Sequence, residues 1–385
     1  MTPHAQRFLV ILLLAWPSVG QAQMPSAGAD FALGGAFKTE FNLDRIGRRG
    51  DRRAYWDFTN KSELALDLSL PAGFSVHGVF KLEPADREPD GSDGFLRAHA
   101  AWVDQFYLNW SRGPVTVFAG KIQPRFGFAW DRAPGLYGDD FAEGYELSEK
   151  IGAGIRLGLS DLFGTTEIGD HSLQAELFRA DRTPLSASLG ARRYAVPSTP
   201  GRYAARNRRA YGGADNTAGF GNYVLSLAGE AVPLGPGKLD YNLAYSSRRA
   251  GEDSIAAATA ATERGHVAGV AWAADLPHGI TATPLAEWVR LDNADGVDRR
   301  RRDVATAGLA VAWAPITLAY TYQWQRDRGD SPARATQHAA SASYDLEAAS
   351  EWLAGFTWTV GWRRLREEGR AANDLGMQLA YGYRF

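Results

Sequence analysis

Side chains of two kinds alternate along much of the chain with a period of two residues. From Phe31 to Leu43 the odd positions are mostly bulky and apolar, whereas the even positions are small or polar. The same alternation returns in residues 64–70, 74–83, 239–246, 316–325 and 356–363. Because successive side chains of a strand point to opposite faces, each segment is predicted to be a strand with one apolar and one polar face. The strands run to about ten residues, which is longer than usual in soluble sheets and close to the length that crosses a bilayer.

Short and long links alternate between the predicted strands, which number sixteen. Tight turns are predicted at 71–73, 111–114, 161–170, 233–237, 277–279, 314–315 and 347–353. Long polar loops are predicted at 44–61, 84–99, 123–146, 181–221, 247–264, 291–303, 327–336 and 366–375. Short turns at one end and long loops at the other are typical of a barrel inserted from the periplasm, and an even strand count puts both chain ends at the short-turn end. We therefore predict an all-β fold, a transmembrane antiparallel β-barrel of about sixteen strands with short periplasmic turns and long extracellular loops. Ala and Gly blur the alternation in the fourth, tenth, eleventh and fourteenth strands.

Charged side chains in the middle of the clear strands lie on the polar face. They are Lys38, Glu40, Glu63, Asp67, Lys81, Arg156, Glu176, Asp240 and Arg363. A Lys or Arg that faces lipid near mid-membrane costs about 2–4 kcal/mol, so the polar face is predicted to be wet. We expect Lys38, Glu40, Lys81, Arg156 and Arg363 to line the wall of a water-filled lumen. A soluble sandwich of shorter strands is the alternative fold.

The first 22 residues have the features of a secretory signal. Arg7 precedes an apolar stretch from residue 8 to 16, Pro17 breaks it, and Gly20 and Ala22 are spaced like a cleavage site. The stretch is too short for a membrane-spanning helix, which needs about 20 residues. We predict a signal peptide over residues 1–22 and an outer-membrane barrel over residues 23–385. The chain has no cysteine, which excludes disulfides and thiol chemistry, and its net charge of -2 argues against nucleic acid as a partner.

The third long loop is the best candidate for a constriction of the lumen. The segment from residue 121 to 152 is rich in acids, with aromatic residues and glycines between them. Its candidate constriction residues are Asp131, Asp139, Asp140, Glu143 and Glu146. Carboxylates that face basic residues across a pore are one way in which charged pores select solutes. A solvated acidic loop outside the membrane is the alternative.

Two other loops are rich in arginine. The loop at 181–221 holds seven arginines, and the sequence "GVDRRRRD" occupies residues 296–303. These arginines are expected either to attract anions toward the mouth of the barrel or to contact the phosphates of lipopolysaccharide. Both interpretations stay open.

The segment around the third loop resembles known outer-membrane families. A strand, the tight turn "SRGP" at 111–114, the strand "VTVFAG" at 115–120 and then "GKIQPRFGF" at 120–128 precede the acidic aromatic segment. This stretch of about thirty residues is similar to the phosphate-selective porin O/P-like and siderophore-porin-like families. The resemblance implies a sixteen-stranded porin, often trimeric, in a Gram-negative outer membrane. The polar faces lack the run of lysines expected for phosphate selectivity, so that specificity is not carried over.

A channel is therefore the predicted function, for passive diffusion of small hydrophilic solutes or ions. The alternative is a substrate-specific uptake channel for a siderophore, a sugar, or an organic or phosphate anion. The mature histidines are scattered and lie in no recognisable catalytic motif, so no enzyme activity, catalytic residue, metal site or cofactor is predicted. The expected partners are outer-membrane lipid, lipopolysaccharide, the barrel-assembly machinery, the solutes and two further copies in a homotrimer.

The end of the chain, "MQLAYGYRF" at 377–385, is predicted to be the last strand. Its odd positions are Met377, Leu379, Tyr381, Tyr383 and Phe385, which are expected to face lipid. The tyrosines then fall in the interfacial aromatic girdle, with Phe385 at the periplasmic boundary. A terminal Phe after alternating aromatics also resembles the signal by which such barrels are recognised for assembly. We expect Tyr381, Tyr383 and Phe385 to carry that signal.

Overall fold

Strands make up most of the described chain. The computed structural model describes residues 31–48, 53–85, 92–190, 205–251, 260–330 and 332–385. The strands are β1 (Ala32–Ile46), β2 (Tyr55–Ser69), β3 (Phe74–Pro84), β4 (Gly94–Phe95), β5 (His99–Arg112), β6 (Val115–Ile122), β7 (Lys150–Gly158), β8 (Asp170–Ala180), β9 (Asn222–Leu234), β10 (Gly237–Arg248), β11 (Glu263–Leu276), β12 (Ile280–Asp292), β13 (Arg301–Trp313), β14 (Ile316–Arg328), β15 (Ala333–Asp345), β16 (Phe356–Glu367) and β17 (Arg370–Arg384).

Helical segments are short and lie in the links. They are α1 (Ala129–Arg132) and α2 (Leu159–Phe163), with the 3-10 turns η1 (Pro71–Gly73), η2 (Glu143–Tyr145), η3 (Thr166–Ile168), η4 (Pro184–Ser186), η5 (Arg209–Tyr211), η7 (Pro277–Gly279), η8 (Ala294–Gly296), η9 (Leu346–Ala348) and η10 (Glu351–Leu353). None of the helices in the described ranges is long and apolar enough to cross a membrane.

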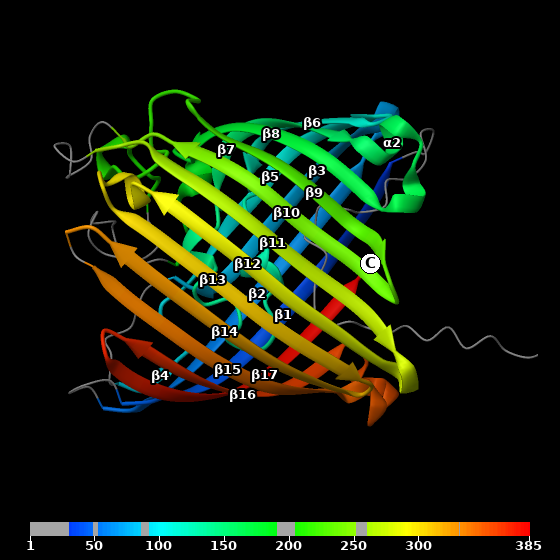
Figure 1. The fold of residues 1–385 in the computed structure, drawn as a ribbon, viewed down its shortest axis with the longest axis vertical. Coiled ribbons are helices and arrows are strands. Elements are labelled where there is room, and N and C mark those ends of the chain that lie inside the picture. The colour runs from blue at the N-terminus through cyan, green and yellow to red at the C-terminus, as the bar shows by residue number, and fades with distance from the viewer. Residues whose placement is uncertain (1–30, 49–52, 86–91, 191–204, 252–259, 331) are drawn as a thin grey trace, which may run out of the picture.

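The long strands pair in chain order into one closed sheet. Each pairs antiparallel with the next, and β17 pairs with β1 from Arg384 opposite Ala36 to Leu375 opposite Arg45. The two-residue β4 adds in parallel to β2 and takes no part in closing the sheet. The predicted sixteen-stranded antiparallel barrel is therefore confirmed (Figure 1).

The two ends of the barrel differ as expected. Compact turns such as η1 and η7 join strands at the end where Arg384 lies, and the longer loops join them at the other end (Figure 1). The described chain begins and ends at the short-turn end, since β1 starts there and β17 finishes there. The predicted signal peptide over residues 1–22 lies outside the described residues.

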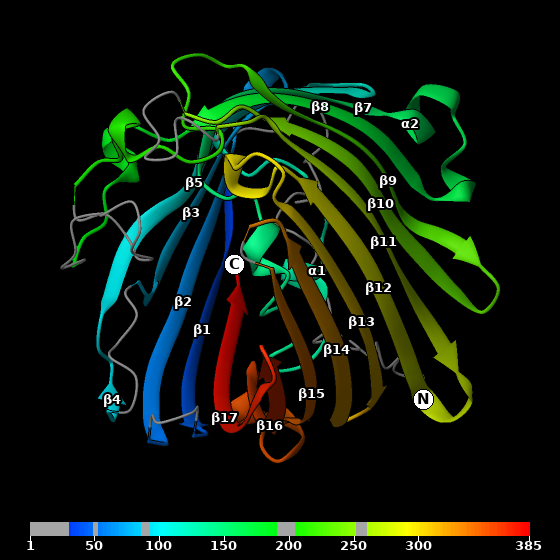
Figure 2. The same ribbon diagram turned by 60° about the vertical axis from the view of Figure 1, so that its left-hand side comes forward.

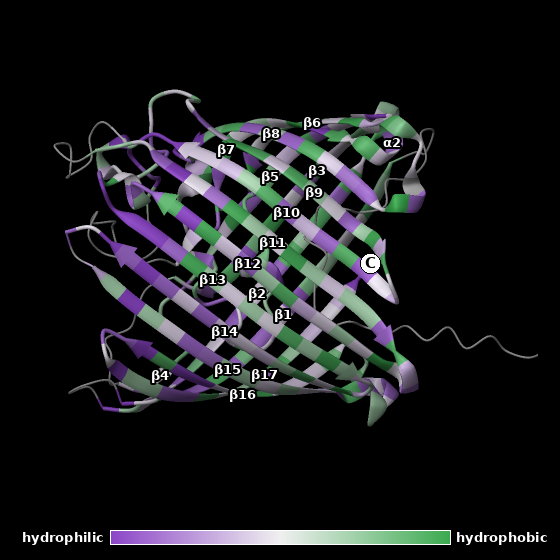
Figure 3. Cartoon of the chain, viewed as in Figure 1, coloured by the Kyte–Doolittle hydropathy of each residue, from purple (hydrophilic) through white to green (hydrophobic). Residues whose placement is uncertain are grey.

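The two faces of the barrel wall carry different side chains. Leu33, Leu108, Ile155 and Leu177 are among the large apolar residues exposed on the outer face. Lys38 and Glu63, opposite each other on β1 and β2, lie on the inner face. Figure 3 shows hydrophilic residues concentrated toward the long-loop ends of strands such as β13 and β14. The outer face therefore suits lipid over the middle of the strands, where a charge would be costly.

The prediction of a long loop at 366–375 is wrong. β16 runs to Glu367 and β17 begins at Arg370, which leaves a two-residue hairpin turn. Glu368 and Gly369 both have positive φ, as this kind of turn requires. The sequence misleads here because strand ends that extend beyond the membrane meet water on both faces, so they lose the alternation by which a strand is recognised. For the same reason β1 and β2 reach into the predicted loop at 44–61.

Candidate functional site

The segment between β6 and β7, residues 123–149, folds inside the barrel. β6 stops at Ile122, and the chain then turns inward and carries α1 and η2 through the interior (Figure 2). Polar contacts join this segment, called here the inner loop, to the inner faces of strands from β8 to β17 and to β1. The interior of the barrel is thereby narrowed on the side of β8 to β17.

Beyond the end of β6, the next loop lies beside β5 in the barrel wall. Leu189 forms a backbone bridge with Ala101 of β5, beyond the last residue that pairs with β6. Lys121, at the end of β6, is fully buried there, and its Nζ lies 2.8 Å from Glu149 and 3.1 Å from Asp181. A buried cation needs such partners to offset its lost hydration. The wall therefore stays closed where the chain leaves it for the interior.

Glu287 of β12 holds the first part of the inner loop. Its carboxylate accepts hydrogen bonds from the backbone N–H groups of Phe128 (2.8 Å) and Ala129 (3.0 Å) and from the hydroxyl of Tyr145 (2.5 Å). The residue is 4% exposed. One side chain of β12 thus holds two parts of the loop, the part that leaves β6 and the part that returns to β7.

An apolar cluster joins the inner loop to the wall. Phe126, Tyr145 and Leu147 of the loop pack against Phe178, Val224, Val267, Leu285, Val289, Leu291 and Val304 of strands β8, β9 and β11 to β13. These wall positions face inward but are dry, because the loop covers them. This explains why β11 and β12, the tenth and eleventh predicted strands, show a blurred alternation.

The tip of the inner loop is held by side chains of β14, β16 and β1. The carbonyl of Pro134 accepts a hydrogen bond from Thr321 (2.6 Å), and the Tyr137 hydroxyl donates to Asp44 of β1. The guanidinium of Arg363 donates to Asp140 (2.7 Å) and to Asp374 (2.6 Å). Arg363 was predicted as a lumen-wall cation and Asp140 as a constriction acid, but the two neutralise each other and anchor the loop.

The remaining predicted acids form one edge of the inner loop, opposite β1 to β3. Glu143 lies 3.8 Å from Lys61 of β2, and both side chains are about half exposed, at 51% and 47%. Asp131 lies within electrostatic range of Lys38 and Lys81. Lys38 pairs with Glu40 (2.5 Å) and Lys81 with Asp104 (3.3 Å), while Glu146 accepts a hydrogen bond from Gln123 of the same loop (2.6 Å). An acidic edge therefore faces a wall on which lysines and acids are interleaved.

Carboxyl groups on the acidic edge hold their protons more strongly than free ones. Loss of hydration, and then the nearby Glu143, raise the pKa of Asp139 to about 8, although Lys61 opposes the shift. Loss of hydration also raises the pKa of Glu146 to about 7 and that of Asp131 to about 6. The charge of the acidic edge is therefore expected to change over the neutral pH range.

Sequence reasoning missed two residues of this arrangement. Lys61 was placed in the loop at 44–61, although its position opposite Glu40 continues the polar face of β2. Glu287 sits in a strand whose alternation is blurred, so nothing set it apart. Of the other predicted residues, Arg156 lies on the inner face of β7, opposite Thr116. Tyr381 and Tyr383 lie on β17, and Phe385 continues its pairing with hydrogen bonds to Gly35, but nothing in these contacts tests an assembly signal.

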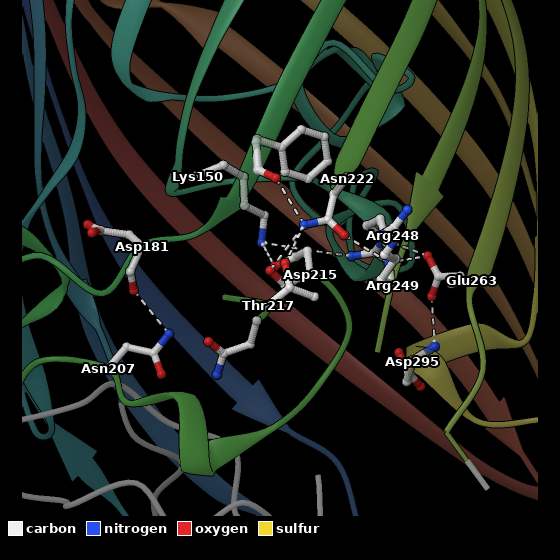
Figure 4. Close-up of polar contacts among 12 residues, drawn as sticks. Lys150, Asp181, Asn207, Asp215, Thr217, Asn222, Arg248, Arg249, Glu263 and Asp295 are labelled. Atoms are coloured by element: carbon white, nitrogen blue, oxygen red, sulfur yellow. Dashed lines mark hydrogen bonds and ion pairs between the residues drawn. The ribbon is translucent and has the colours of Figure 1, made fainter. Parts of the chain in front are cut away.

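A buried network of charges binds the fourth long loop to the rim of the barrel (Figure 4). Asp215 of that loop lies 3.2 Å from Lys150 of β7 and 3.3 Å from Arg248 of β10. Arg248 also donates from Nε to Glu263 of β11 at 2.7 Å, and Glu263 accepts from the backbone of Asp295. The described part of this loop therefore has a fixed place on the rim.

Some arginines of the two arginine-rich loops form ion pairs with acids. In the 296–303 segment, Arg300 and Arg302 both lie within 3.0 Å of Asp327, and Arg301 lies 2.7 Å from Asp292. Arg192, Arg193 and Arg202 of the 181–221 loop lie outside the described residues. These pairs reduce the positive charge that the 296–303 segment can offer, while contact with anions or lipopolysaccharide stays a prediction.

Comparison with known proteins places the fold. No protein-family model matches the chain, and neither does any curated protein. Among solved structures, the outer membrane channel DcaP of Acinetobacter baumannii is similar over 94% of this chain and 99% of its own, with a TM-score of 0.54 and 13% identity. A loop-deletion mutant of OmpT, an outer membrane protein of Vibrio cholerae, is similar over 92% and 99%, with a TM-score of 0.53 and 9% identity. OpdK of Pseudomonas aeruginosa, solved with vanillate, is similar over 92% and 99%, with a TM-score of 0.51 and 11% identity.

At these identities the likeness concerns the fold. This fold is that of outer-membrane β-barrel proteins, channels among them. None of the three structures is described as a phosphate-selective or siderophore porin, so the two families that the sequence resembles are not confirmed.

Proposed function

We propose that the protein forms a water-filled channel across the outer membrane for passive diffusion of small hydrophilic solutes or ions. The observation that carries this proposal is the inner loop, whose acidic edge faces the lysines of β1 to β3 inside the barrel. Lys38, Lys61 and Glu143 each keep about half of their side-chain surface exposed within the interior. Charged side chains exposed in this way need water around them, and a wet path through the barrel is a channel.

Conductance of the purified protein in a planar bilayer tests the proposal. We expect steps of constant size in KCl, with a current linear in voltage. Neutralising the acidic edge with Asp139→Asn and Glu143→Gln together should shift the reversal potential in a KCl gradient toward anions. Asp140 is left unchanged because it also anchors the loop through Arg363. Glu351→Gln, in the exposed turn η10, is the matched control and should leave the reversal potential unchanged.

Absence of conductance from barrels that migrate as compact, heat-modifiable species would reject the channel. Unchanged selectivity in the double variant would show that the acidic edge does not face the path of the ions.

A substrate-specific uptake channel is the second candidate. One observation favours it: Arg156, on the inner wall, makes no ion pair or hydrogen bond within the described parts of the chain. A strictly linear conductance that millimolar solutes leave unchanged would reject this candidate and retain the general channel.

The homotrimer, contact with lipopolysaccharide and recognition of Tyr381, Tyr383 and Phe385 by the barrel-assembly machinery remain proposals. The outward row that ends in Phe385 supports the last of these, because these aromatics face the surroundings of the barrel at the closing strand. Migration of the unheated protein at three times the size of the monomer would support the trimer, and migration as a monomer would count against it.

A further inference from the structure

Arginines gather on the outer face of β12 to β16, near the long-loop end of the barrel. The arginines that alternate to this face are Arg290, Arg301, Arg326, Arg328, Arg334, Arg364 and Arg366. The acids of these five described strands that alternate to the same face are Asp292 and Asp303. Figure 3 shows this end of β13 and β14 as hydrophilic. This part of the outer wall therefore carries an excess of positive charge.

Both acids of this face are already paired. Asp303 lies 2.7 Å from Arg290 and 3.6 Å from Arg328. Asp292 lies 2.7 Å from Arg301. The other four arginines are exposed, and their side chains form no ion pair or hydrogen bond with any residue that the structure describes. We call these four, Arg326 of β14, Arg334 of β15, and Arg364 and Arg366 of β16, the outer arginine cluster.

The strand register brings the four guanidinium groups into one patch. Arg326 lies directly opposite Arg334 in the pairing of β14 with β15. Arg366 lies opposite Thr336, two residues along β15 from Arg334, and Arg364 follows on the same face of β16. Like charges that lie opposite each other on a sheet destabilise it. An anion bound between these side chains would remove that repulsion.

Three more acids lie near the cluster in the sequence. Glu367 alternates to the inner face, opposite Ala335. Asp330 and Glu368 lie in the turns that follow β14 and β16. None of the three forms an ion pair with the cluster in the described part of the chain. The compensating charge is therefore expected to come from outside the protein.

The outward side chains of β14 show at what depth of the membrane the cluster lies. From the short-turn end to the long-loop end they are Ile316, Leu318, Tyr320, Tyr322, Trp324, Arg326 and Arg328. Aromatic side chains of a barrel mark the boundary between the hydrocarbon and the headgroups. The cluster lies just beyond this boundary at the extracellular end, which is the level of the headgroups of the outer leaflet.

We propose that the outer arginine cluster binds the phosphates of lipopolysaccharide in the outer leaflet. A guanidinium matches a phosphate through two parallel hydrogen bonds, and a phosphate monoester carries a charge of about -1.5 to -2 near neutral pH. The inference assigns this contact to the wall of the barrel, whereas the described arginines of the 296–303 segment are paired with acids. It concerns the outer surface and is independent of what passes through the lumen.

The experiment uses the full barrel in detergent and lipid A that carries two phosphates as the probe. Binding is measured by titration and by native mass spectrometry. Arg326→Gln and Arg334→Gln together should weaken binding at least about tenfold, because each arginine lost removes a charge-assisted contact. Arg364→Gln and Arg366→Gln together test the other half of the cluster in the same way. Both variants should keep heat-modifiable migration, because these side chains are exposed and hold no other described residue.

The matched control removes two positive charges at the other end of the barrel. Arg112 of β5 and Lys238 of β10 are exposed near the short-turn end. Arg112→Gln and Lys238→Gln together should leave lipid A binding unchanged. Lipid A from which both phosphates have been removed is the matched probe, and it should bind the unmodified barrel at least about tenfold more weakly.

Four results would overturn the proposal. Equal binding of lipid A to both cluster variants and to the unmodified barrel would place the lipid elsewhere. Equal binding of the two forms of lipid A would show that the acyl chains, and not the phosphates, are recognised. An equal loss of binding in the short-turn control would reduce the effect to net charge. Displacement of lipid A by millimolar inorganic phosphate would make free phosphate, rather than the lipid, the ligand of the cluster.

Discussion

Replacing Glu287 with alanine should release the inner loop from the wall without opening the barrel. In the structure one carboxylate accepts hydrogen bonds from Phe128, Ala129 and Tyr145, which belong to two separate parts of the loop. Glu287→Ala removes all three hydrogen bonds at once. The strand pairing of β12 involves only backbone groups and stays intact.

The size of the effect follows from those contacts. Hydrogen bonds to a charged group contribute about 1.5–3 kcal/mol each, so three of them contribute roughly 4–9 kcal/mol if nothing replaces them. Water in the interior can bond the freed groups, so we expect the lower end, about 4 kcal/mol. That loss corresponds to about a thousandfold rise in the population of the released loop. The apolar packing of Phe126 and Leu147 remains and limits the movement.

Two assays report the release. Trypsin should cut Glu287→Ala after Arg125 or Arg132, which are held inside the barrel in the unmodified protein, where each is paired with an acid. The open-channel current should become noisier, because the loop moves in the path of the ions. Glu287→Gln keeps one acceptor oxygen but places an NH₂ group against a backbone donor, so it should show a weaker form of both effects.

Glu351→Ala is the control for a lost carboxylate, since that residue lies in the exposed turn η10. If Glu287→Ala resists trypsin as well as this control does and conducts with the same noise, Glu287 does not hold the loop and the reasoning fails.

Three further expectations rest on other contacts. Lowering the pH from about 9 to about 5 should shift the selectivity toward anions, because the raised pKa values of Asp139, Glu146 and Asp131 make these acids neutral at higher pH than free carboxyls; a reversal potential that stays constant over this range would contradict the effect. Gly308→Leu should lower the conductance, because a Cβ at Gly308 would lie 2.5 Å from the Cδ of Pro134 and push the loop toward the lumen; unchanged conductance would mean that the loop yields elsewhere. Deleting Phe385 should reduce insertion into the outer membrane far more than it alters the conductance of the barrels that do insert, and normal insertion would count against an assembly signal there.

A feature of this fold could be predicted from the sequence where neighbouring residues alone reveal it. Residues 31–43 reveal two faces by alternation alone, and the structure has these faces outside and inside the barrel. The end of β16 could not be predicted in this way, because Arg366 and Glu367 lie where both faces meet water and polar residues stand on both sides. The strand count, the closure and the orientation of the turns needed only the lengths and order of such segments.

The inner loop shows what the sequence leaves open. Its acids Asp131, Asp139, Asp140, Glu143 and Glu146 could be named from composition, but their roles could not be assigned. Asp140 turned out to be bound to Arg363, 223 positions away, whereas Glu143 faces the interior. Gln337, which donates to the carbonyl of Tyr137 at a separation of 200 residues, could not have been chosen among the other glutamines.

The sequence by itself determined the barrel, because alternation every two residues is a property of the strand and needs no knowledge of distant contacts. Only the tertiary structure decided where the inner loop lies, which charges are cancelled and which, like Arg156, have no ion-pair partner among the residues that the structure describes. Those outcomes depend on closing the sheet, which brings β1 beside β17 and places Glu287 across the lumen from β3. The effect of a charged side chain on a solute depends on the groups next to that side chain, and closure of the barrel determines which groups these are.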